Sequence, residues 1–287
     1  MPATHESTAI AAWADRRPDL RALIQIGSRA QPAGSDQWSD YDYQLVTTRP
    51  AAYRDPAVYR PLGEPWVVAL QPVFGGALKT TLILPGAVEV DFVILSALEV
   101  RLAFAALRAP GLAALWPAPL RRGVRDLRIV ACPGWRIVKG GAAWQRRYTR
   151  LGSSVPWPAL TAADLHALNS EFWAAAVWIA KKISRGELRA AQREFHRALA
   201  EKIWQLLEHE ARLQRAPARP EARRAETWLP TARVEQTGFA TRPDPAALRH
   251  ALRHAVAVFD EASAALARHH GWPAPDFAAV RAWVLHH

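Results

Sequence analysis

The hydrophobic pattern of the chain changes once, near residue 157, and this change limits the folds available to it. Before that point, short apolar runs alternate with turn signals, which is typical of β-strands. After it, apolar residues recur at three- and four-residue steps, as in helices that bury one face. The pattern predicts an α+β protein with two domains. We expect a mixed β-sheet with flanking helices in residues 1–155 and an all-helical domain in residues 156–287.

Five apolar runs in the first half are expected to form strands, and two segments have helical spacing. Leu84-Pro85-Gly86-Ala87 contains the residues of a tight turn and is expected to close a hairpin between the last two strands. The expected strands cover residues 23–26, 43–47, 66–73, 79–84 and 88–95, and the expected helices cover residues 6–15 and 97–107.

Capping signals mark where helices begin in the second half. Thr161-Ala-Ala-Asp164 resembles a capping box and predicts a helix that continues to about Ile183. Asp244-Pro245 supplies an N-cap followed by proline at the first helical position, which predicts a helix to about His269. We also expect helices at residues 187–212 and 276–285, with an exposed arginine-rich connection at residues 214–224.

Composition excludes several classes of protein. Half of the 287 residues are apolar and 22% are charged, which excludes a mainly disordered chain. The single cysteine, Cys132, excludes an intramolecular disulfide and a cysteine-based zinc site. No segment approaches the roughly 20 apolar residues of a membrane helix, and the N-terminus lacks the order of a signal peptide. We therefore expect a cytoplasmic protein without a membrane segment.

The chain is basic, with 37 Lys and Arg against 26 Asp and Glu and a net charge of +11. Such an excess favours polyanionic partners, because basic side chains neutralise phosphates. Only five of the basic residues are lysines, and the chain is also rich in alanine and proline, so genome-wide codon bias is a second explanation. Nucleic acid stays open as a partner.

The strongest functional signal is a Gly-Ser pair followed by an Asp-x-Asp motif. Gly27-Ser28 ends one expected strand, and Asp40 and Asp42 precede the next. Residues two apart on a strand face the same side, so these two carboxylates can hold one or two hard divalent cations. Gly27 allows close approach of a phosphate, and Ser28 adds a hydroxyl and an amide, ideally at a helix N-terminus. The motif predicts a site where metal and phosphate meet.

A third carboxylate follows on a later strand. In residues 88–94 the apolar side chains alternate with Glu89 and Asp91, which therefore share the opposite face. If this strand pairs beside the one that starts at Asp42, Asp91 completes a cluster of three carboxylates. Such a cluster suits in-line attack on the α-phosphate of a nucleotide, with metals neutralising the phosphate oxygens. The combination predicts a nucleotidyltransferase.

These motifs resemble those of the DNA polymerase beta-type nucleotidyltransferases, and more closely those of the aminoglycoside 6-adenylyltransferases, also called streptomycin adenylyltransferases. The resemblance covers most of the chain and is least certain over residues 205–241. In the first half it rests on Gly27-Ser28-Arg29-Ala30, Ser39-Asp40-Tyr41-Asp42 and Val90-Asp91. In the second half it rests on Asn169-Ser-Glu171-Phe172-Trp173, Ile179-Ala180-Lys181 and Arg185-Gly-Glu187-Leu188.

The resemblance implies a role for each matching residue. Asp40 and Asp42 would bind Mg²⁺, and Asp91 would bind metal or deprotonate the acceptor hydroxyl. The residues implied to hold the triphosphate of ATP are Gly27, Ser28, Arg29 and Lys181.

Two further residues are implied to contact the acceptor. A carboxylate at Glu171 would pair with a cationic sugar, and the ring of Trp173 would cover its apolar face. Trp173 is followed by apolar residues, so a place in the hydrophobic core is an alternative for it. Lys181 has a comparable alternative as a surface lysine near the end of an amphipathic helix.

Two departures from the family bear on the acceptor. Residues 129–135 are uncharged, where we expect the family to have an acidic and basic turn. A protein of charge +11 also repels a polycationic antibiotic at long range unless its site is locally acidic. Three functions stay open: adenylyl transfer from ATP to an aminoglycoside hydroxyl, the same chemistry on another small alcohol, protein or RNA end, and nucleotide sensing without transfer.

Overall fold

The computed structural model describes most of the chain as two compact units, Met1–Trp157 and Pro158–His287. The described residues are 5–31, 35–73, 77–108, 115–131, 134–151, 160–214, 216, 218 and 221–286. Cys132 and the expected domain boundary at residue 155 lie outside them. Each unit has a hydrophobic core of its own, and the α+β prediction is confirmed. The described residues contain no helix whose length and hydropathy would let it span a lipid bilayer.

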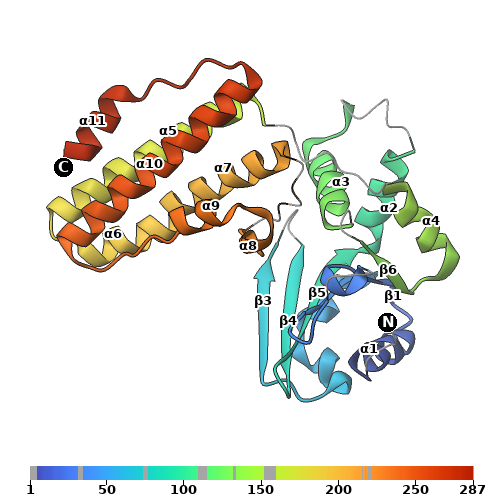
Figure 1. Ribbon diagram of the computed structural model, residues 1–287. Helices are drawn as coiled ribbons and strands as arrows, with labels where there is room; N and C mark the ends of the chain where they lie inside the picture. The colour runs from blue at the N-terminus through green and yellow to red at the C-terminus, as the bar shows by residue number, and fades with distance from the viewer. Residues whose placement is uncertain are drawn as a thin grey trace. The chain divides into compact units, whose positions relative to one another are not determined.

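A six-stranded sheet forms the centre of the first unit (Figure 1). Its strand order is β3-β4-β5-β2-β1-β6, and neighbouring strands are antiparallel except for the parallel pair β2 and β5. Each of the five expected strands is present, and the expected turn joins β4 to β5. The strands are β1 (Leu20–Gln25), β2 (Tyr41–Thr47), β3 (Val67–Pro72), β4 (Leu78–Leu84), β5 (Val88–Ser96) and β6 (Arg136–Lys139).

One face of the sheet is covered by α1 (His5–Asp15) and two 3-10 helices, η2 (Pro50–Arg54) and η3 (Pro56–Leu62). Phe92 of β5 lies at the centre of this layer, with ring centroids 5.3 Å from those of Trp13 and Tyr59. Aromatic rings bury large apolar areas, so this cluster fixes α1 and η3 against the middle of the sheet.

The other face is covered by α2 (Ala97–Ala106), α3 (Ala118–Ala131) and α4 (Gly141–Leu151), drawn in green in Figure 1. The expected helix at residues 97–107 is confirmed as α2, whereas α3, α4 and β6 were not expected. Four arginines interrupt the apolar spacing of α3 and three interrupt that of α4. The four residues of β6 are too few to show an alternating pattern.

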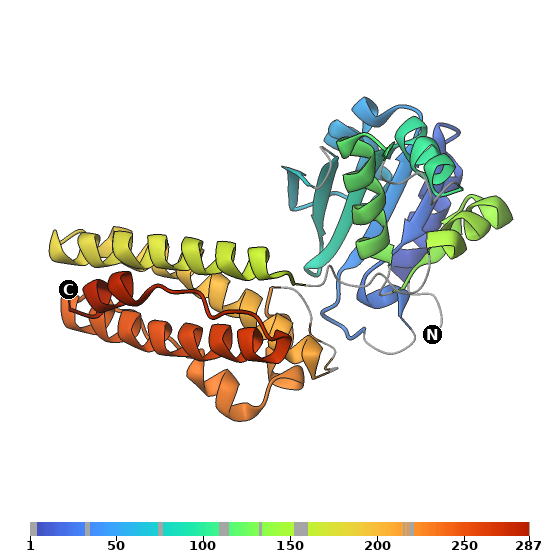
Figure 2. The ribbon, with the colours of Figure 1, turned by 90° about the horizontal axis from the view of Figure 1, so that it is seen from above.

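The second unit is a bundle of helices, and Figure 2 shows its two longest, α5 (Ala162–Ser184) and α10 (Pro245–His270), running side by side. Stacked rings of Phe172 and Phe259, 3.7 Å apart, join them. Asn169 donates a buried hydrogen bond of 2.9 Å to Ser263 across the same interface. The remaining elements are α6 (Leu188–Glu194), a π-helical turn (Phe195–Leu199), α7 (Ala200–Leu213), α8 (Ala225–Trp228), α9 (Thr231–Gln236) and α11 (Ala278–His286).

The sequence signals for this unit are largely confirmed. Thr161 and Asp164 form the complete capping box, and Asp244 caps α10 through the backbone amide of Ala247. The helix expected at residues 187–212 is wrong in one detail, because the π-helical turn interrupts it. The short helices α8 and α9 follow the arginine-rich connection and were not expected.

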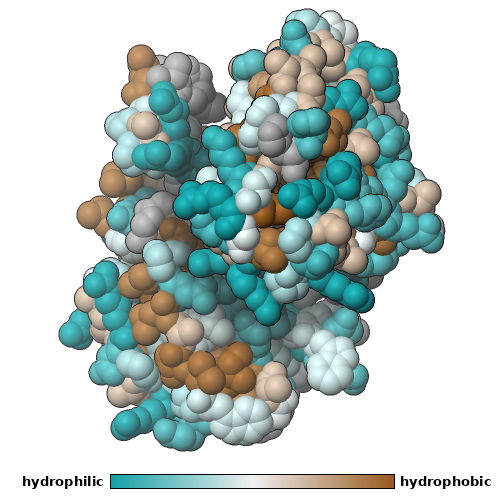
Figure 3. Space-filling model, turned by 90° about the vertical axis from the view of Figure 1, so that its left-hand side faces the viewer, coloured by the Kyte–Doolittle hydropathy of each residue, from teal (hydrophilic) through white to brown (hydrophobic). Residues whose placement is uncertain are grey.

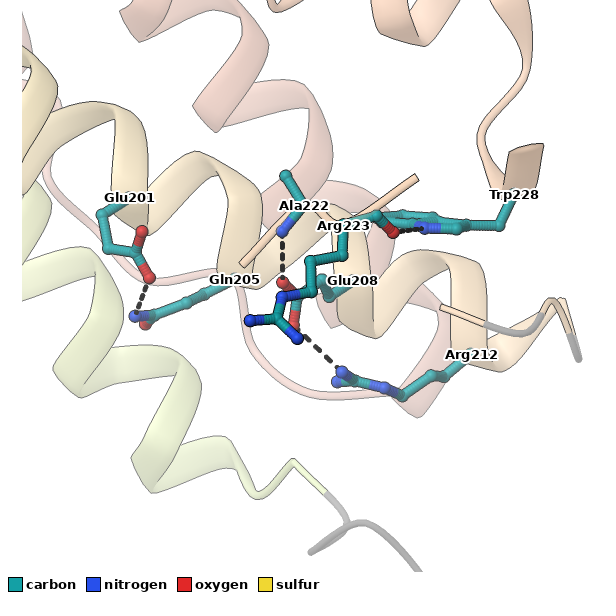
Figure 4. Close-up of polar contacts among 7 residues, drawn as sticks. All are labelled: Glu201, Gln205, Glu208, Arg212, Ala222, Arg223 and Trp228. Atoms are coloured by element: carbon teal, nitrogen blue, oxygen red, sulfur yellow. Dashed lines mark hydrogen bonds and ion pairs between the residues drawn. The ribbon is translucent and has the colours of Figure 1, made fainter. Parts of the chain in front are cut away.

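Glu208 of α7 is a buried carboxylate that anchors part of the arginine-rich connection (Figure 4). It accepts hydrogen bonds from the backbone amide of Ala222 at 3.4 Å and from Arg212 at 3.0 Å. Burial raises the pKa of Glu208 above its ordinary value, although these two partners oppose the shift. Folding therefore stabilises the protonated form of this side chain.

The face drawn in Figure 3 is largely hydrophilic, with hydrophobic residues gathered in separate patches. In the first unit, three exposed hydrophobic side chains lie at or beside β3, which is an edge strand. They are Trp66, Val67 and Leu70, which are 64%, 51% and 41% exposed.

We predict that Thr161→Ala lowers the free energy of unfolding by about 1 kcal/mol, because it removes the side-chain acceptor of the α5 capping box. Urea unfolding followed by circular dichroism measures the loss. Thr149→Ala is the control, since Thr149 is exposed in the last turn of α4 and its hydroxyl donates to the carbonyl of Gln145 in the preceding turn. Equal losses in the two variants would show that the cap does not stabilise the unit.

We predict that the free energy of unfolding of Glu208→Gln rises relative to that of wild type as pH rises from about 4 to 7. The raised pKa means that ionising Glu208 costs stability in the folded state, and this cost appears above the ordinary value of 4.5. Glutamine stays neutral throughout. Urea unfolding at both pH values measures the difference, and Glu201→Gln, an exposed change on the same helix, is the control. A difference between Glu208→Gln and wild type that does not change with pH would contradict the assignment.

Candidate active site

Gly27 brings the end of β1 against a carboxylate of β2. Its φ of +73° is a conformation that residues with a Cβ rarely adopt. A Cβ built on Gly27 would lie 2.2 Å from Oδ2 of Asp42, and the amide of the preceding residue, Ile26, donates to the carbonyl of Asp42 at 2.9 Å. Glycine is therefore required for this close approach.

The turn after Gly27 is a short 3-10 helix, η1 (Ser28–Ala30). We expected Ser28 to lie ideally at the N-terminus of a longer helix, and the structure differs on this point. A single 3-10 turn has no aligned set of free amides and no appreciable dipole. Any phosphate contact here would come from the individual amide and hydroxyl groups of Gly27 and Ser28.

The parallel pairing of β2 and β5 places Asp42 directly opposite Asp91. Residues alternate between the two faces of each strand, and Val90, Phe92 and Ile94 lie in the core under α1. Asp91 therefore lies on the other face, as predicted. Further along β2 this face is covered by α2, α3 and α4, so the two carboxylates lie beyond the apolar part of the sheet.

Asp91 is 5% exposed, and both of its oxygens are engaged by β4. Lys79 donates to Oδ2 at 2.7 Å, and Thr81 donates to Oδ1 at 2.5 Å. Thr81 is the register partner of Asp91, and Lys79 reaches it diagonally from two residues away. The carboxylate is therefore held in one orientation.

The charges around Lys79 are mainly negative. Burial alone would lower the pKa of Lys79, but the hydrogen bond to Asp91 and the charges of Asp91, Asp42 and Glu89 raise it above the ordinary value. Burial, followed by the charges of Asp40 and Asp91, raises the pKa of Glu89. Three carboxylates thus act on the ammonium of Lys79, and Asp40 joins them through its effect on Glu89.

This carboxylate cluster, Asp40, Asp42, Glu89 and Asp91, suits a hard cation. Its oxygens are the donors that Mg²⁺ prefers, and the ammonium of Lys79 already places one positive charge among them. Within the described residues, however, no three His, Cys, Asp or Glu side chains are arranged so that they could hold a metal ion. The cluster therefore supplies the donor atoms of a metal site but not the arrangement of one, and in this structure Lys79 is bonded to Asp91.

Arg29 braces the turn that precedes Asp40. Its Nε donates to the carbonyl of Ser39 at 2.8 Å, its Nη2 lies 3.4 Å from the carbonyl of Asp36, and its guanidinium stacks 4.0 Å from the ring of Tyr41. The sequence predicted a triphosphate contact for Arg29. The contacts of its guanidinium fix the approach to Asp40, and the triphosphate contact stays a prediction.

The three candidates in the helical unit lie in different environments. Lys181 is exposed near the end of α5, and Glu171 is exposed and pairs with Lys202 of α7. Trp173 is 2% exposed and packs against Phe172. This burial makes Trp173 a core residue, so the structure gives no support to an acceptor contact through its ring.

Sequence reasoning missed Lys79, Thr81 and Glu89 as members of the site. A signal was present, because Lys79 and Thr81 share one face of an expected strand that forms a hairpin with the strand of Asp91. The register of that hairpin decides which side chains meet. With Thr81 placed opposite Asp91, Lys79 follows as its diagonal neighbour.

Comparisons with known proteins give weak structural similarity. No protein-family model and no curated protein sequence matches the chain. An aminoglycoside 6-adenyltransferase from Bacillus subtilis superposes with a TM-score of 0.45 and 11% identity, over 98% of this chain and 97% of its own. A nucleotidyltransferase-like protein from Exiguobacterium sibiricum superposes with a TM-score of 0.31 and 14% identity, over 91% of this chain and 78% of its own. Similarities of this size are too weak to assign the chain to a family.

We predict that Gly27→Ala destabilises the protein well beyond the matched change Gly186→Ala. Both glycines have a φ of +73°, so both variants carry the backbone penalty of about 1–2 kcal/mol. Only at Gly27 does the new Cβ also meet Asp42, since nothing lies within 4 Å of a Cβ at Gly186. Urea unfolding compares the two, and equal losses would contradict the close approach of Gly27 and Asp42.

Proposed function

We propose that the chain is a metal-dependent nucleotidyltransferase that transfers AMP from ATP to a hydroxyl of an aminoglycoside such as streptomycin. The observation that carries the proposal is the pairing of Asp42 with Asp91 on adjacent parallel strands, with Gly27 directly against Asp42. This arrangement joins a candidate phosphate-binding turn to a carboxylate pair at the same end of the sheet.

In this proposal Asp40 and Asp42 hold Mg²⁺, and Asp91 completes the carboxylate set as a metal ligand or as the base. The bound metal would neutralise charge on the phosphate oxygens and on the departing pyrophosphate. The acceptor oxygen forms a bond to the α-phosphorus, while the bond from that phosphorus to the β-phosphate oxygen breaks. The hydroxyl proton passes to a carboxylate, and pyrophosphate leaves.

The nucleotide would be held mainly through its phosphates. Gly27 allows the backbone to approach them, and Ser28 contributes its hydroxyl and amide. Lys181 is the proposed contact from the helical unit, where its exposed ammonium is available to an anion. Arg29 braces the turn before Asp40, and the same guanidinium is the proposed contact with the triphosphate from this turn.

The charge of the site favours a cationic acceptor over RNA. Four carboxylates lie here with three cations, Lys79, Arg29 and Arg136, so this part of a +11 protein carries a slight negative charge. Glu89 is not assigned to metal in the proposal, and its carboxylate is therefore available to an amino or guanidino group. Glu171 is a second candidate for such a contact, because it is exposed, although it is paired with Lys202.

We predict that Asp42→Ala abolishes nucleotidyl transfer while the fold is kept, because Asp42 is only partly buried and lies at the end of the sheet. Purified protein is incubated with Mg²⁺, the four NTPs and a panel of aminoglycosides that includes streptomycin. Pyrophosphate detection and mass spectrometry of the antibiotics report the reaction. The control Asp55→Ala changes a carboxylate outside the cluster, at the N-cap of η3.

Each outcome has a distinct meaning. A nucleotidylated drug that is absent with Asp42→Ala supports both the chemistry and the acceptor. Pyrophosphate without a modified drug supports the chemistry and contradicts the acceptor. Binding of nucleotide with no pyrophosphate contradicts transfer and favours a nucleotide-sensing protein, and an active Asp42→Ala variant contradicts the site.

A further inference from the structure

Lys79 occupies a place that the proposed function leaves unexplained. Its ammonium is bonded to Asp91 at 2.7 Å, with the charges of Asp42 and Glu89 also acting on it. The side chain of Lys79 is 27% exposed and that of Asp91 is 7% exposed, so the pair lies at the edge of solvent rather than deep in the core. Solvent therefore reaches this ion pair mainly through Lys79.

The cation paired with Asp91 is a lysine and not an arginine, and this choice affects how readily it can be displaced. The chain has 32 arginines and only five lysines, yet a lysine faces the carboxylate cluster. An arginine fork would hold a carboxylate through two parallel hydrogen bonds, whereas an ammonium is a point charge on a flexible stem. An ammonium is therefore the easier of the two to exchange for another cation.

Thr81 makes such an exchange feasible without moving the carboxylate. It holds Oδ1 of Asp91, while Lys79 holds only Oδ2. If the ammonium withdraws, the hydrogen bond from Thr81 still fixes the orientation of Asp91 and leaves Oδ2 available. The two contacts thus divide into one that orients the carboxylate and one that neutralises it.

We propose that Lys79 is an exchangeable counter-ion that competes with the divalent metal for Asp91. Without metal, its ammonium balances the charge of Asp91 and keeps the cluster compact. When metal binds, the ammonium gives up Oδ2 of Asp91, and it returns when the metal leaves. This inference rests on the proposed function, because it assumes that the carboxylate cluster takes a divalent cation.

The experiment measures Mn²⁺ binding to the full chain without nucleotide, using electron paramagnetic resonance of free Mn²⁺. Lys79→Met removes the competing charge and is expected to bind Mn²⁺ about tenfold more tightly than wild type. Lys79→Arg keeps a cation there and is expected to bind no more tightly than wild type. Lys202→Met is the matched control, since it removes the lysine paired with the exposed carboxylate of Glu171 in the helical unit.

A double-mutant cycle separates competition for Asp91 from a general charge effect. The increase in Mn²⁺ affinity caused by Lys79→Met should disappear when Asp91 is also changed to Asn. An equal increase in Mn²⁺ affinity in the Asp91→Asn protein overturns the proposal. So does an unchanged Mn²⁺ affinity in a Lys79→Met protein that has the circular dichroism of wild type. If Lys79→Met does not fold, the more polar Lys79→Gln takes its place in the cycle.

The same measurements distinguish failure of this inference from failure of the proposed function. Mn²⁺ binding by wild type that Lys79→Met leaves unchanged overturns the role of Lys79 alone. Absence of binding by wild type and by both Lys79 variants overturns this inference together with the metal site. Nucleotidyl transfer is assayed separately, so its absence does not affect the binding result.

Discussion

The parallel pairing of β2 and β5 is the constraint on which the rest of the sheet unit depends. Its register sets Asp42 beside Asp91, and the same register sends Phe92 into the aromatic layer under α1. A slip of one residue would exchange these faces, burying carboxylate among aromatic rings. The hydrophobic layer therefore holds the polar site in register, and the burial of Phe92 stabilises the position of Asp91.

Much of this arrangement could be predicted because each strand of the sheet centre carries its own pattern. The alternation in residues 88–94 gave the face of Asp91, and the capping residues gave the start of α5 and α10. In the sheet unit, two helices and one strand were missed because their signals are weak: α3 and α4 are interrupted by arginines, and β6 has four residues. The contact of Lys79 with Asp91 depends on cross-strand register, which is a tertiary property.

The carboxylate cluster is a concentration of negative charge in a basic protein. The net charge is +11, yet the end of the sheet gathers Asp40, Asp42, Glu89 and Asp91, with Lys79 and Arg29 beside them. Bringing carboxylates together in a partly desolvated place costs free energy, since each raises the cost of ionising its neighbours. Gly27, the Arg29 brace and the Thr81 hydrogen bond fix the turn and Asp91 in place despite this cost.

The π-helical turn between α6 and α7 explains an unusual spacing in the helical core. Five buried residues recur at four-residue steps, and on an ideal α-helix such steps drift by about 40° each, or about 160° in total. A wider turn absorbs part of this drift, which keeps the residues facing the core. They are Ala191, Phe195, Leu199, Ile203 and Leu207. With one residue removed from the turn, the five side chains would point within about 80° of one another around the helix axis. The turn therefore has the geometry of a single residue inserted into a continuous helix.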